Sequence, residues 1–271
     1  MNRIAISAVI ITKNEESTLA DCLASLDEFD EVLVVDNGST DSTLNVAREY
    51  ENVKVIESAW LGYGPTRQLG VNAAKNEWIF WIDADERLPQ ELSTELRAKL
   101  AVASRNNVFA LKRHNYFLGR RIRGCGWSPD WVIRLFHRKH AGFNSKTVHE
   151  GLTGYQKSDI LKARSPLIHF SYRSIRQFFE KNMRYAGLAA LERARTGRTV
   201  EFWQIPLRTA WEFFRNYIIR RGLFDGIPGF VICVGSAIYI FTRDTICYLE
   251  SKSGTPSGSN ESTQLKTQTD H

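Results

Sequence analysis

Short apolar runs separated by helical patterns constrain the fold of this chain more than any other feature. Four runs rich in β-branched residues lie within the first hundred positions, at 6–12, 31–36, 53–57 and 78–83. Between the first two runs, Leu19, Cys22, Leu23 and Leu26 follow the i, i+3, i+4, i+7 spacing of an amphipathic helix. Runs that are apolar on both faces are typical of parallel strands covered by helices. We therefore expect an α/β fold in which a Rossmann-like, mostly parallel sheet is flanked by helices.

The pattern changes after residue 106. Three further strand-like segments follow, separated by long loops that carry Gly and Trp, and they occupy residues 108–117, 130–138 and 165–172. We expect these strands to complete a first domain over residues 1–172, with one half at 1–105 and the other at 106–172.

Residues 173–250 are predicted to form a basic, aromatic and helical C-terminal extension. Residues 173–221 hold 11 Arg and Lys against 4 Glu. Residues 227–242 carry no charge and are mostly apolar, but this run is shorter than the roughly 20 residues that span a bilayer. Residues 251–271 are polar and rich in Ser and Thr, so we expect a disordered tail.

The charge and the cysteines limit the partners and the compartment. A net charge of +6 and a pI near 9.2 favour an anionic partner such as a phosphate, a nucleotide or a membrane surface, but are too weak to indicate nucleic acid. The four cysteines form no CxxC motif, which indicates neither a zinc site nor a disulfide framework. The N-terminal apolar run reaches Lys13 too soon for a signal peptide. We therefore expect a reduced, cytoplasmic location.

Polar and mostly acidic residues follow the predicted strands of the first half. The first strand ends in TKNEE, the second in DNGSTD and the fourth in DADE, and the helix after the third opens with GYGPTRQ. In an open parallel sheet, ligands bind beyond the carboxyl ends of the strands. These groups are therefore predicted to gather along one ligand-binding edge.

Asp83 and Asp85 in the DADE segment are candidates for a metal site. On extended chain their carboxylates would point to the same face, roughly 6.5 Å apart, and repel each other. A divalent cation relieves this repulsion, and magnesium or manganese is held by one or two carboxylates plus phosphate oxygens. The alternative is a solvated acidic turn that begins the next helix. We interpret Glu86 as a helix N-terminal acid, whose substitution should matter least of the three.

Glycine motifs exclude two classes of nucleotide-binding protein. The chain has no GxGxxG after the first strand and no GxxxxGK[ST], which argues against a dinucleotide-binding protein and a P-loop ATPase. Phosphate must then be neutralised by other groups, and a metal on Asp83 and Asp85 together with Arg67 would do this. Asp36 could accept hydrogen bonds from a nucleobase or a ribose.

Three motifs at strand ends, SAVIITKNEES, VVDNGSTDST and WIFWIDADE, resemble those of the family 2 glycosyltransferases, which have the GT-A nucleotide-sugar-binding fold. The resemblance spans residues 6–90, with the motifs in the family's order and spacing. The segments WSPDWVIRLFHR, VHEG and IHFSYRS extend it to residue 175 and resemble the subgroup of lipopolysaccharide core β-1,4-glucosyltransferases. The resemblance implies a hexosyltransferase that uses a nucleotide-sugar donor.

The resemblance also implies roles for residues of the nucleotide site. Thr12 and Glu15 would line this site, and Asp36 would contact a uracil-type base. Arg67 would lie near the nucleotide.

The DAD motif matches the metal- and ribose-binding DxD motif of the family. Asp85 would be the direct ligand of Mn²⁺ or Mg²⁺, and Asp83 would lie nearer the ribose. His169 in LIHFSY is a candidate second ligand, because imidazole is tolerated although manganese prefers oxygen. The alternative is that this His, in an apolar strand, is a buried core residue.

The enzymes that this chain resembles invert the anomeric centre, because an acceptor hydroxyl displaces the nucleoside diphosphate in one step. The reaction needs a carboxylate base near the hydroxyl and positive charge on the departing diphosphate. Many family members supply the base from an ED pair, which this chain lacks. We predict Glu150 in KTVHEG as the base and Asp130 in WSPDW as the second candidate. The alternative for Glu150 is a surface turn.

Aromatic and basic residues near Asp130 are candidates for acceptor binding. Trp127 and Trp131 could stack on an acceptor sugar, and Arg134 could bind the donor diphosphate or an anionic acceptor. The alternatives are core packing, which is the commoner fate of Trp, and an outward-facing charge on the strand for Arg134.

Aromatic residues interleave with the arginines of the C-terminal extension. Basic helices with Trp and Phe suit an anionic bilayer surface, near which each basic residue contributes on the order of 1 kcal/mol. We predict that residues 173–250 associate peripherally with the cytoplasmic face of the inner membrane. The alternative is a helical hairpin that packs its aromatics on the first domain while its arginines are solvated.

Together these patterns predict an inverting glycosyltransferase that moves a hexose onto a lipopolysaccharide inner-core heptose or a related glycolipid, with UDP-glucose as the donor implied by the resemblance. One alternative is a sugar nucleotidyltransferase, which would carry a Gly-rich loop where this chain has TKNEES. Another is a non-catalytic sugar-binding or scaffold protein, against which the intact DAD and DNGSTD motifs argue.

Overall fold

The computed structural model describes most of the chain, at residues 3–144, 151–172 and 174–253. The predicted base Glu150 lies outside the described residues. Of the tail predicted to be disordered, residues 254–271 also lie outside them, whereas residues 251–253 end a helix. The prediction was wrong for residues 251–253 because the final helix continues past the last apolar positions.

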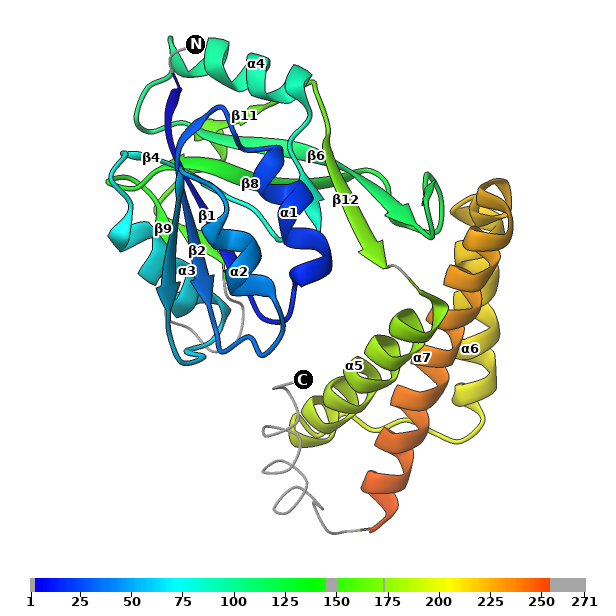
Figure 1. Cartoon of the computed structure of the whole chain (residues 1–271). Helices are drawn as coiled ribbons and strands as arrows, with labels where there is room; N and C mark the ends of the chain where they lie inside the picture. The colour runs from blue at the N-terminus through cyan, green and yellow to red at the C-terminus, as the bar shows by residue number, and fades with distance from the viewer. Residues whose placement is uncertain (1–2, 145–150, 173, 254–271) are drawn as a thin grey trace. The chain divides into compact units, whose positions relative to one another are not determined.

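The chain divides into two compact units, coloured along the chain in Figure 1. The sheet unit comprises residues 1–114 and 130–169, and the helical unit comprises residues 115–129 and 170–271. The predicted first domain ran without interruption to residue 172, whereas the structure assigns the segment 115–129 to the helical unit. Its Ile122 and Cys125 side chains are buried in a core shared with the helices, which explains the grouping.

Four parallel strands form the first half of a large sheet. They are β1 (Ile4–Thr12), β2 (Phe29–Asp36), β3 (Val53–Glu57) and β4 (Trp78–Trp81). Their order is β3-β2-β1-β4, and the register places Thr12 of β1 opposite Asp36 of β2. The predicted α/β fold with a mostly parallel sheet is confirmed, and the carboxyl ends of these strands share one edge.

Later strands continue the sheet beyond β4. β8 pairs antiparallel with β4, β6 pairs antiparallel with β8, and the order then runs through β12 to β5. β7 and β11 pair with β6, while β9 and β10 form a separate two-stranded sheet. The bounds are β5 (Glu86–Arg87), β6 (Val108–Phe117), β7 (Arg120–Arg121), β8 (Asp130–His137), β9 (Gly142–Phe143), β10 (Leu152–Thr153), β11 (Ile160–Lys162) and β12 (Leu167–Tyr172).

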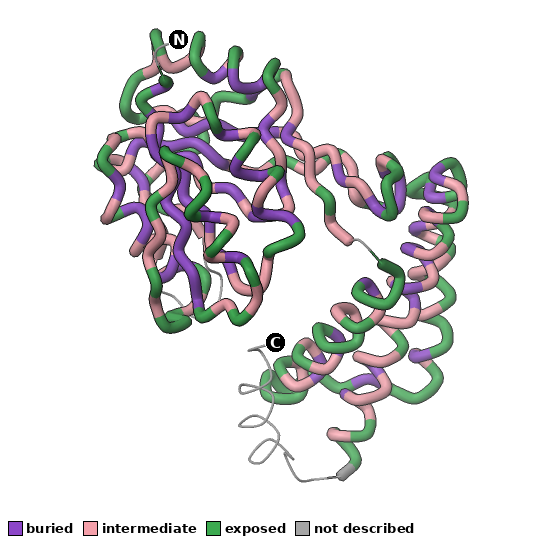
Figure 2. The backbone as a smooth tube through the Cα atoms, in the orientation of Figure 1, coloured by how far each residue is buried: buried purple, intermediate pink, exposed green. Residues whose placement is uncertain are grey.

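Helices cover both faces of the sheet, and its strands β1 and β2 are buried along most of their length (Figure 2). They are α1 (Glu16–Ala24), α2 (Thr43–Arg48), α3 (Tyr63–Ala73) and α4 (Gln90–Leu100), with a 3-10 turn at Lys157–Asp159. Leu19 and Leu92 share one core cluster with Ile10, whereas Val71 shares another with Val9. Neighbouring residues of a strand point to opposite faces, so α1 and α4 cover one face and α3 covers the other.

Gly70 allows α3 to pack closely on the sheet. A Cβ atom at this position would overlap the side chains of Val9 and Val35. The helix therefore sits directly on β1 and β2, and it carries Arg67 one turn before the close contact.

The helical unit contains the predicted C-terminal helices. They are α5 (Ile175–Arg195), α6 (Gln204–Phe214), a π-helical turn at Arg215–Ile219, a 3-10 turn at Gly222–Asp225 and α7 (Gly226–Ser253). The Ser174 hydroxyl caps α5 by accepting a hydrogen bond from the N–H of Gln177 at 3.0 Å. Phe178 of α5 packs with Ile232 and Cys233 of α7.

One helical segment, Gly222–Lys252, meets the length and composition of a membrane span among the described residues. Its most apolar window has a mean hydropathy of 1.8, and 33% of that window is buried. The predicted apolar run at 227–242 is therefore part of a longer helix, which packs against α5 and α6.

Candidate active site

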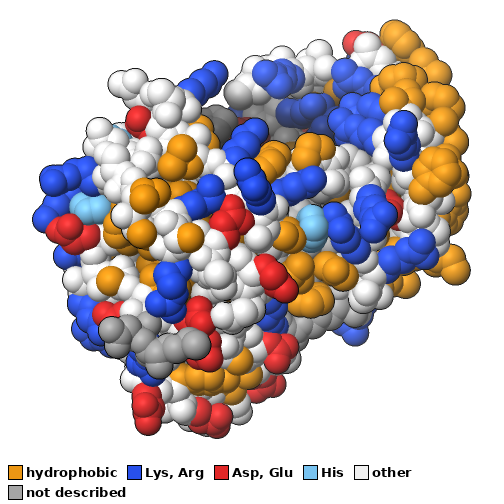
Figure 3. Space-filling model, turned by 90° about the horizontal axis from the view of Figure 1, so that it is seen from above, with side chains coloured by type: hydrophobic (Ala, Val, Ile, Leu, Met, Phe, Trp, Pro, Cys, Tyr) orange, Lys and Arg blue, Asp and Glu red, His pale blue; other side chains and the backbone are white. Residues whose placement is uncertain are grey.

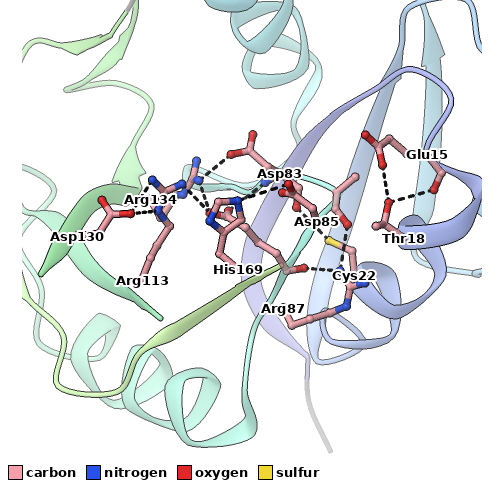
Figure 4. Close-up of polar contacts among 12 residues, drawn as sticks. Glu15, Thr18, Cys22, Asp83, Asp85, Arg87, Arg113, Asp130, Arg134 and His169 are labelled. Atoms are coloured by element: carbon pink, nitrogen blue, oxygen red, sulfur yellow. Dashed lines mark hydrogen bonds and ion pairs between the residues drawn. The ribbon is translucent and has the colours of Figure 1, made fainter. Parts of the chain in front are cut away.

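The acidic segment after β4 forms a tight turn that carries Asp83 and Asp85 (Figure 4). The N–H of Glu86 donates a hydrogen bond to the carbonyl oxygen of Asp83 at 2.9 Å. The N–H of Asp83 donates in return to Oε2 of Glu86 at 3.1 Å. The expectation that the strand extends through Asp83 is wrong, because β4 ends at Trp81 and the backbone closes onto Glu86.

Glu86 is fully buried and ion-paired. Its Oε1 lies 2.5 Å from Nη2 of Arg134 and 3.3 Å from Nη1 of Arg113. It belongs to β5, opposite His169 of β12. The interpretation of Glu86 as a helix N-terminal acid is wrong, because α4 begins only at Gln90. Burial raises the pKa of the Glu86 carboxyl above its ordinary value, against the opposing charge of Arg134.

Arg134 of β8 points into the sheet unit, so the alternative of an outward-facing charge is excluded. The side chain is 1% exposed, and its Nη2 donates to Oδ2 of Asp83 at 2.8 Å as well as to Glu86. Its guanidinium lies 3.5 Å from the ring centroid of Trp81, a cation–π contact. Nε and Nη1 are buried and have no hydrogen-bond partner in the described part of the chain. Arg134 thus joins Asp83 to Glu86.

Arg67 of α3 contacts the other carboxylate oxygen of Asp83. Its Nη2 lies 3.3 Å from Oδ1, and its guanidinium lies 4.2 Å from the ring centroid of Trp81. Burial raises the pKa of Asp83, but the charges of Arg134 and Arg67 outweigh burial and hold this pKa below its ordinary value. Burial also lowers the pKa of Arg67, while Asp83 opposes that shift. Asp83 is therefore ionised and neutralised by two arginines.

Asp85 and His169 form a pair that fits a divalent cation. Oδ2 of Asp85 lies 3.4 Å from Nε2 of His169, and the two side chains are 31% and 16% exposed. Two neighbouring ligands of an octahedral ion lie roughly 3 Å apart, which is close to this spacing. Across residues 3–144, 151–172 and 174–253, no group of three or more His, Cys, Asp or Glu could hold a metal. Phosphate or water oxygens would have to supply the remaining ligands.

Asp36 organises the loop of the DNGSTD motif. Its Oδ1 accepts hydrogen bonds from the hydroxyls of Thr12, at 3.2 Å, and Ser39. Its Oδ2 accepts from the N–H groups of Gly38 and Ser39, both at 2.9 Å. These four donors match the number of acceptor positions on a carboxylate, and Asp36 is 1% exposed. For Asp36 to accept a hydrogen bond from a nucleobase, as predicted, one of these four hydrogen bonds would have to break.

The loops after β1 and β2 are joined by hydrogen bonds. The N–H of Glu15 donates to the Thr43 hydroxyl at 2.8 Å, and the N–H of Thr40 donates to Oδ1 of Asn14 at 2.8 Å. Oε2 of Glu15 also accepts from the Thr18 hydroxyl at 2.6 Å. The TKNEE and DNGSTD motifs therefore lie together, as their positions at neighbouring strand ends predict.

The second candidate base, Asp130, is paired with an arginine. Nε of Arg113 donates to Oδ2 of Asp130 at 2.8 Å, and Nη2 of Arg113 lies 2.8 Å from the same oxygen. Because Arg113 also contacts Glu86, one arginine connects Asp130 to the acidic turn (Figure 4). The neighbouring Trp131 is 39% exposed, with Nζ of Lys162 4.7 Å from its ring centroid.

Trp127 belongs to the helical unit, whereas Trp131 belongs to the sheet unit. Its half-buried ring packs with Phe117 at 6.0 Å and Tyr172 at 6.1 Å between centroids. The packing fits the alternative of a core aromatic. Acceptor binding by Trp127 has no support from these contacts.

The sequence analysis did not predict that Trp81 contacts two arginines or that Arg113 pairs with Glu86 and Asp130, and it misassigned Glu86. Trp81 lies under both Arg67 and Arg134. A signal was available, since several acids at strand ends require cations on neighbouring strands, and the predicted strand at 108–117 contains Arg113.

Comparisons with known proteins identify the family through its sequence model. The sequence model described as Glycosyl transferase family 2 matches residues 7–160. The lipopolysaccharide core biosynthesis glycosyltransferase LpsC of Rhizobium meliloti strain 1021 is 30% identical over 88% of this chain and 90% of its own length. An uncharacterized glycosyltransferase of Rickettsia typhi, RT0209, is 32% identical over 88% and 84%. The crystal structure of S. aureus TarS 1–349 in complex with UDP covers 94% of this chain and 92% of its own, at 16% identity and a TM-score of 0.48.

Proposed function

Because the chain belongs to glycosyl transferase family 2 and is a glycosyltransferase, we propose that it moves a hexose from a UDP-sugar to a glycolipid with inversion of the anomeric centre. UDP-glucose is the proposed donor, on the resemblance of the strand-end motifs. A heptose of the lipopolysaccharide inner core or a related glycolipid is the proposed acceptor, which the similarity to LpsC supports. The observation that carries the proposal is the acidic turn, where Asp85 faces His169 beside an ionised Asp83.

The donor is proposed to bind along the carboxyl edge of β1, β2 and β4. Thr12 and Glu15 would line the nucleotide site, and Asp36 would hold the loop against the base. Arg67 lies close enough to Asp83 to form an ion pair and is partly exposed, so it would place positive charge near the diphosphate.

Asp85 and His169 are the residues that would hold Mn²⁺ or Mg²⁺. When bound, the ion would supply positive charge against the departing diphosphate. The chain's own residues keep Asp83 ionised through Arg134 and Arg67, and they fix the turn that orients Asp85.

Glu150 is the proposed general base, and Asp130 is the second candidate. Asp130 is ranked second because its Oδ2 already accepts a hydrogen bond from Nε of Arg113. Trp131 is the proposed stacking surface for the acceptor sugar, because its ring is exposed. Arg134 is almost fully buried, so we propose that it acts through Asp83 rather than by touching the acceptor.

The helical unit is proposed to bind peripherally to the anionic cytoplasmic face of the inner membrane. The excess of Arg and Lys in residues 173–221 and the exposed rings of Phe202, Trp203 and Trp211 support this. Such a location would bring a soluble donor to a lipid-borne acceptor.

A transfer assay tests the proposed reaction directly. The protein would be incubated with radiolabelled UDP-glucose, Mn²⁺ and lipopolysaccharide truncated to its heptoses, and the anomeric configuration of the product would be read by NMR. We expect a β-linked product from the α-linked donor. Formation of UDP-glucose from glucose 1-phosphate and UTP would instead indicate a nucleotidyltransferase, and sugar binding without turnover would indicate a scaffold.

A further inference from the structure

The start of α7 forms an exposed apolar tip on the helical unit. Phe224 and Ile227 are 70% and 79% exposed, and the neighbouring Leu223 is 38% exposed. All three lie in the 3-10 turn and the first turn of α7. Large apolar side chains that are exposed together mark an interaction site more often than an ordinary surface.

An apolar stripe on α6 and the π-helical turn belongs to the same unit. Leu207, Trp211, Phe214 and Ile218 are each between 45% and 61% exposed. Their spacing of four, three and four residues places them on one helical face. Figure 3 shows apolar side chains along the right-hand edge of this view, with Lys and Arg side chains beside them.

A basic pocket of about 560 Å³ lies at the tip. Its lining residues are Arg123, Gly124, Arg221, Phe224 and Asp225. The volume is within the range of small-molecule sites. The two arginines come from segments a hundred residues apart, which the fold brings to one pocket.

The carboxylate of Asp225 is already engaged within the loop. Its Oδ1 accepts the N–H of Arg123 at 3.0 Å, and its Oδ2 accepts the N–H of Gly124 at 2.6 Å. The side chains of Arg123 and Arg221 are exposed and have no ion pair with any described residue. The pocket therefore combines two guanidinium groups that form no ion pair with a described residue, the buried Asp225 carboxylate and an exposed aromatic ring.

We propose that this pocket binds the phosphate groups of anionic membrane lipids while Phe224 and Ile227 enter the acyl boundary. Guanidinium groups bind phosphate oxygens in a fork geometry, and apolar side chains beside them gain free energy by leaving water. This inference rests on the proposed membrane association and specifies which residues contact the membrane. One of them, Arg123, lies in the segment 115–129, outside the basic helices.

A control surface exists at the other end of the same unit. Arg195 and Arg198 are exposed, and the carbonyl oxygen of Arg198 accepts from the Cys247 thiol. Cys247 and Gly226 lie in the same helix, and their separation at 1.5 Å per residue is about 30 Å. Losing two charges there leaves the tip unchanged.

Vesicle flotation tests the pocket. The full chain would be mixed with vesicles of equal parts phosphatidylglycerol and phosphatidylcholine at low salt, and its partition coefficient measured. We expect R123Q/R221Q to weaken partitioning about 10- to 30-fold, and R195Q/R198Q to weaken it much less. F224A/I227A should also weaken partitioning, at every salt concentration. Unchanged circular dichroism would verify that each variant folds.

Four outcomes would overturn the inference. Equal losses for the two arginine pairs would show general basicity in place of a pocket. Unchanged flotation of R123Q/R221Q beside a floating wild type would remove the pocket and keep membrane association, whereas a wild type that does not float would remove both. A thermal shift with inorganic phosphate but no vesicle binding would indicate free phosphate as the ligand. UDP binding by these variants should match wild type in every case.

Discussion

Among the described residues, the sheet unit and the helical unit each have a cluster in which arginines surround a buried carboxylate, but only the cluster of the sheet unit has further acids at its edge. In the helical unit, Asp244 is fully buried and lies within 3.3 Å of nitrogens of Arg193, Arg208 and Arg243. The acid is surrounded by cations from three helical segments. This cluster joins α5, α6 and α7 and has no acid left for a ligand.

The cluster in the sheet unit has the same buried centre with a different outer part. Glu86 is fully buried against Arg134 and Arg113, as Asp244 is against its arginines. Asp83 shares Arg134 with Glu86, yet its side chain is 36% exposed, and Asp85 follows at 31%. A buried acid–arginine cluster therefore stabilises the fold, and partly exposed acids held by such a cluster indicate a ligand site.

The largest effect is expected at Asp85. D85N should lower transfer at least about 10³-fold, because it removes the proposed metal carboxylate from the exposed side of the cluster. Steady-state transfer to truncated lipopolysaccharide at saturating Mn²⁺ measures this. D27N, which removes an exposed acid elsewhere in the sheet unit, should match wild type. Comparable activity in D85N and D27N would show that the exposed acids are not part of a site.

The next effect is expected at the base. E150Q should preserve UDP binding and lower kcat about 10²- to 10³-fold, since a positioned base contributes in this range. D130N, measured beside it by kcat and by UDP affinity, should lose much less. The reverse ranking would assign the base to Asp130 and connect it through Arg113 to the cluster.

A matched pair of substitutions separates the two buried acids. E86Q and D244N should each cost about 3 kcal/mol of unfolding free energy, because each removes a fully buried carboxylate charge that the surrounding arginines neutralise. Only E86Q should also weaken the affinity for Mn²⁺ about 10- to 100-fold, since Glu86 holds the turn that carries Asp85. Urea unfolding and Mn²⁺ titration in the presence of UDP measure the two effects. Equal loss of Mn²⁺ affinity in D244N would erase the distinction between the clusters.

The smallest effect is expected in the pH dependence of stability. The folded-state pKa of Asp83 lies below its ordinary value of 3.8, so ionised Asp83 stabilises the fold above that pH. This stabilisation is lost as the pH falls through the lowered pKa. The difference in unfolding free energy between wild type and D83N should therefore be constant above pH 5 and shrink below pH 4, as measured by urea unfolding. A difference that grows towards acid pH would contradict the charge assignment of Asp83.

The sequence was sufficient to predict the parallel strands and the edge at which the acids lie. β3 spans Val53–Glu57 and β6 spans Val108–Phe117, as predicted, because apolar runs bounded by polar turns identify buried strands. The acids at Asp83 and Asp85 could be placed at this edge because the ends of parallel strands meet there. His169 could be named only as a tolerated metal ligand, because it lies within β12, which pairs antiparallel with β5.

The inward-facing charges could not be predicted in the same way. Arg134 is buried because β8 lies antiparallel between β4 and β6, with Leu135 opposite Phe80, and pattern alone does not give that register. Glu86 is buried because the chain forms a two-residue strand before α4, where the sequence resembles a helix start. Trp127 and Trp131 are four residues apart but belong to different units, since the loop at 115–129 packs with the helices.

Calorimetric titration of UDP tests the assignment of the acidic turn most directly. Wild type and D85N would each be titrated with UDP in Mn²⁺ and in EDTA. We predict that wild type binds UDP in Mn²⁺ and much more weakly in EDTA, and that D85N in Mn²⁺ binds as weakly as wild type in EDTA. Equal UDP affinity of wild type with and without Mn²⁺ would contradict a metal-assisted site at Asp85 and His169.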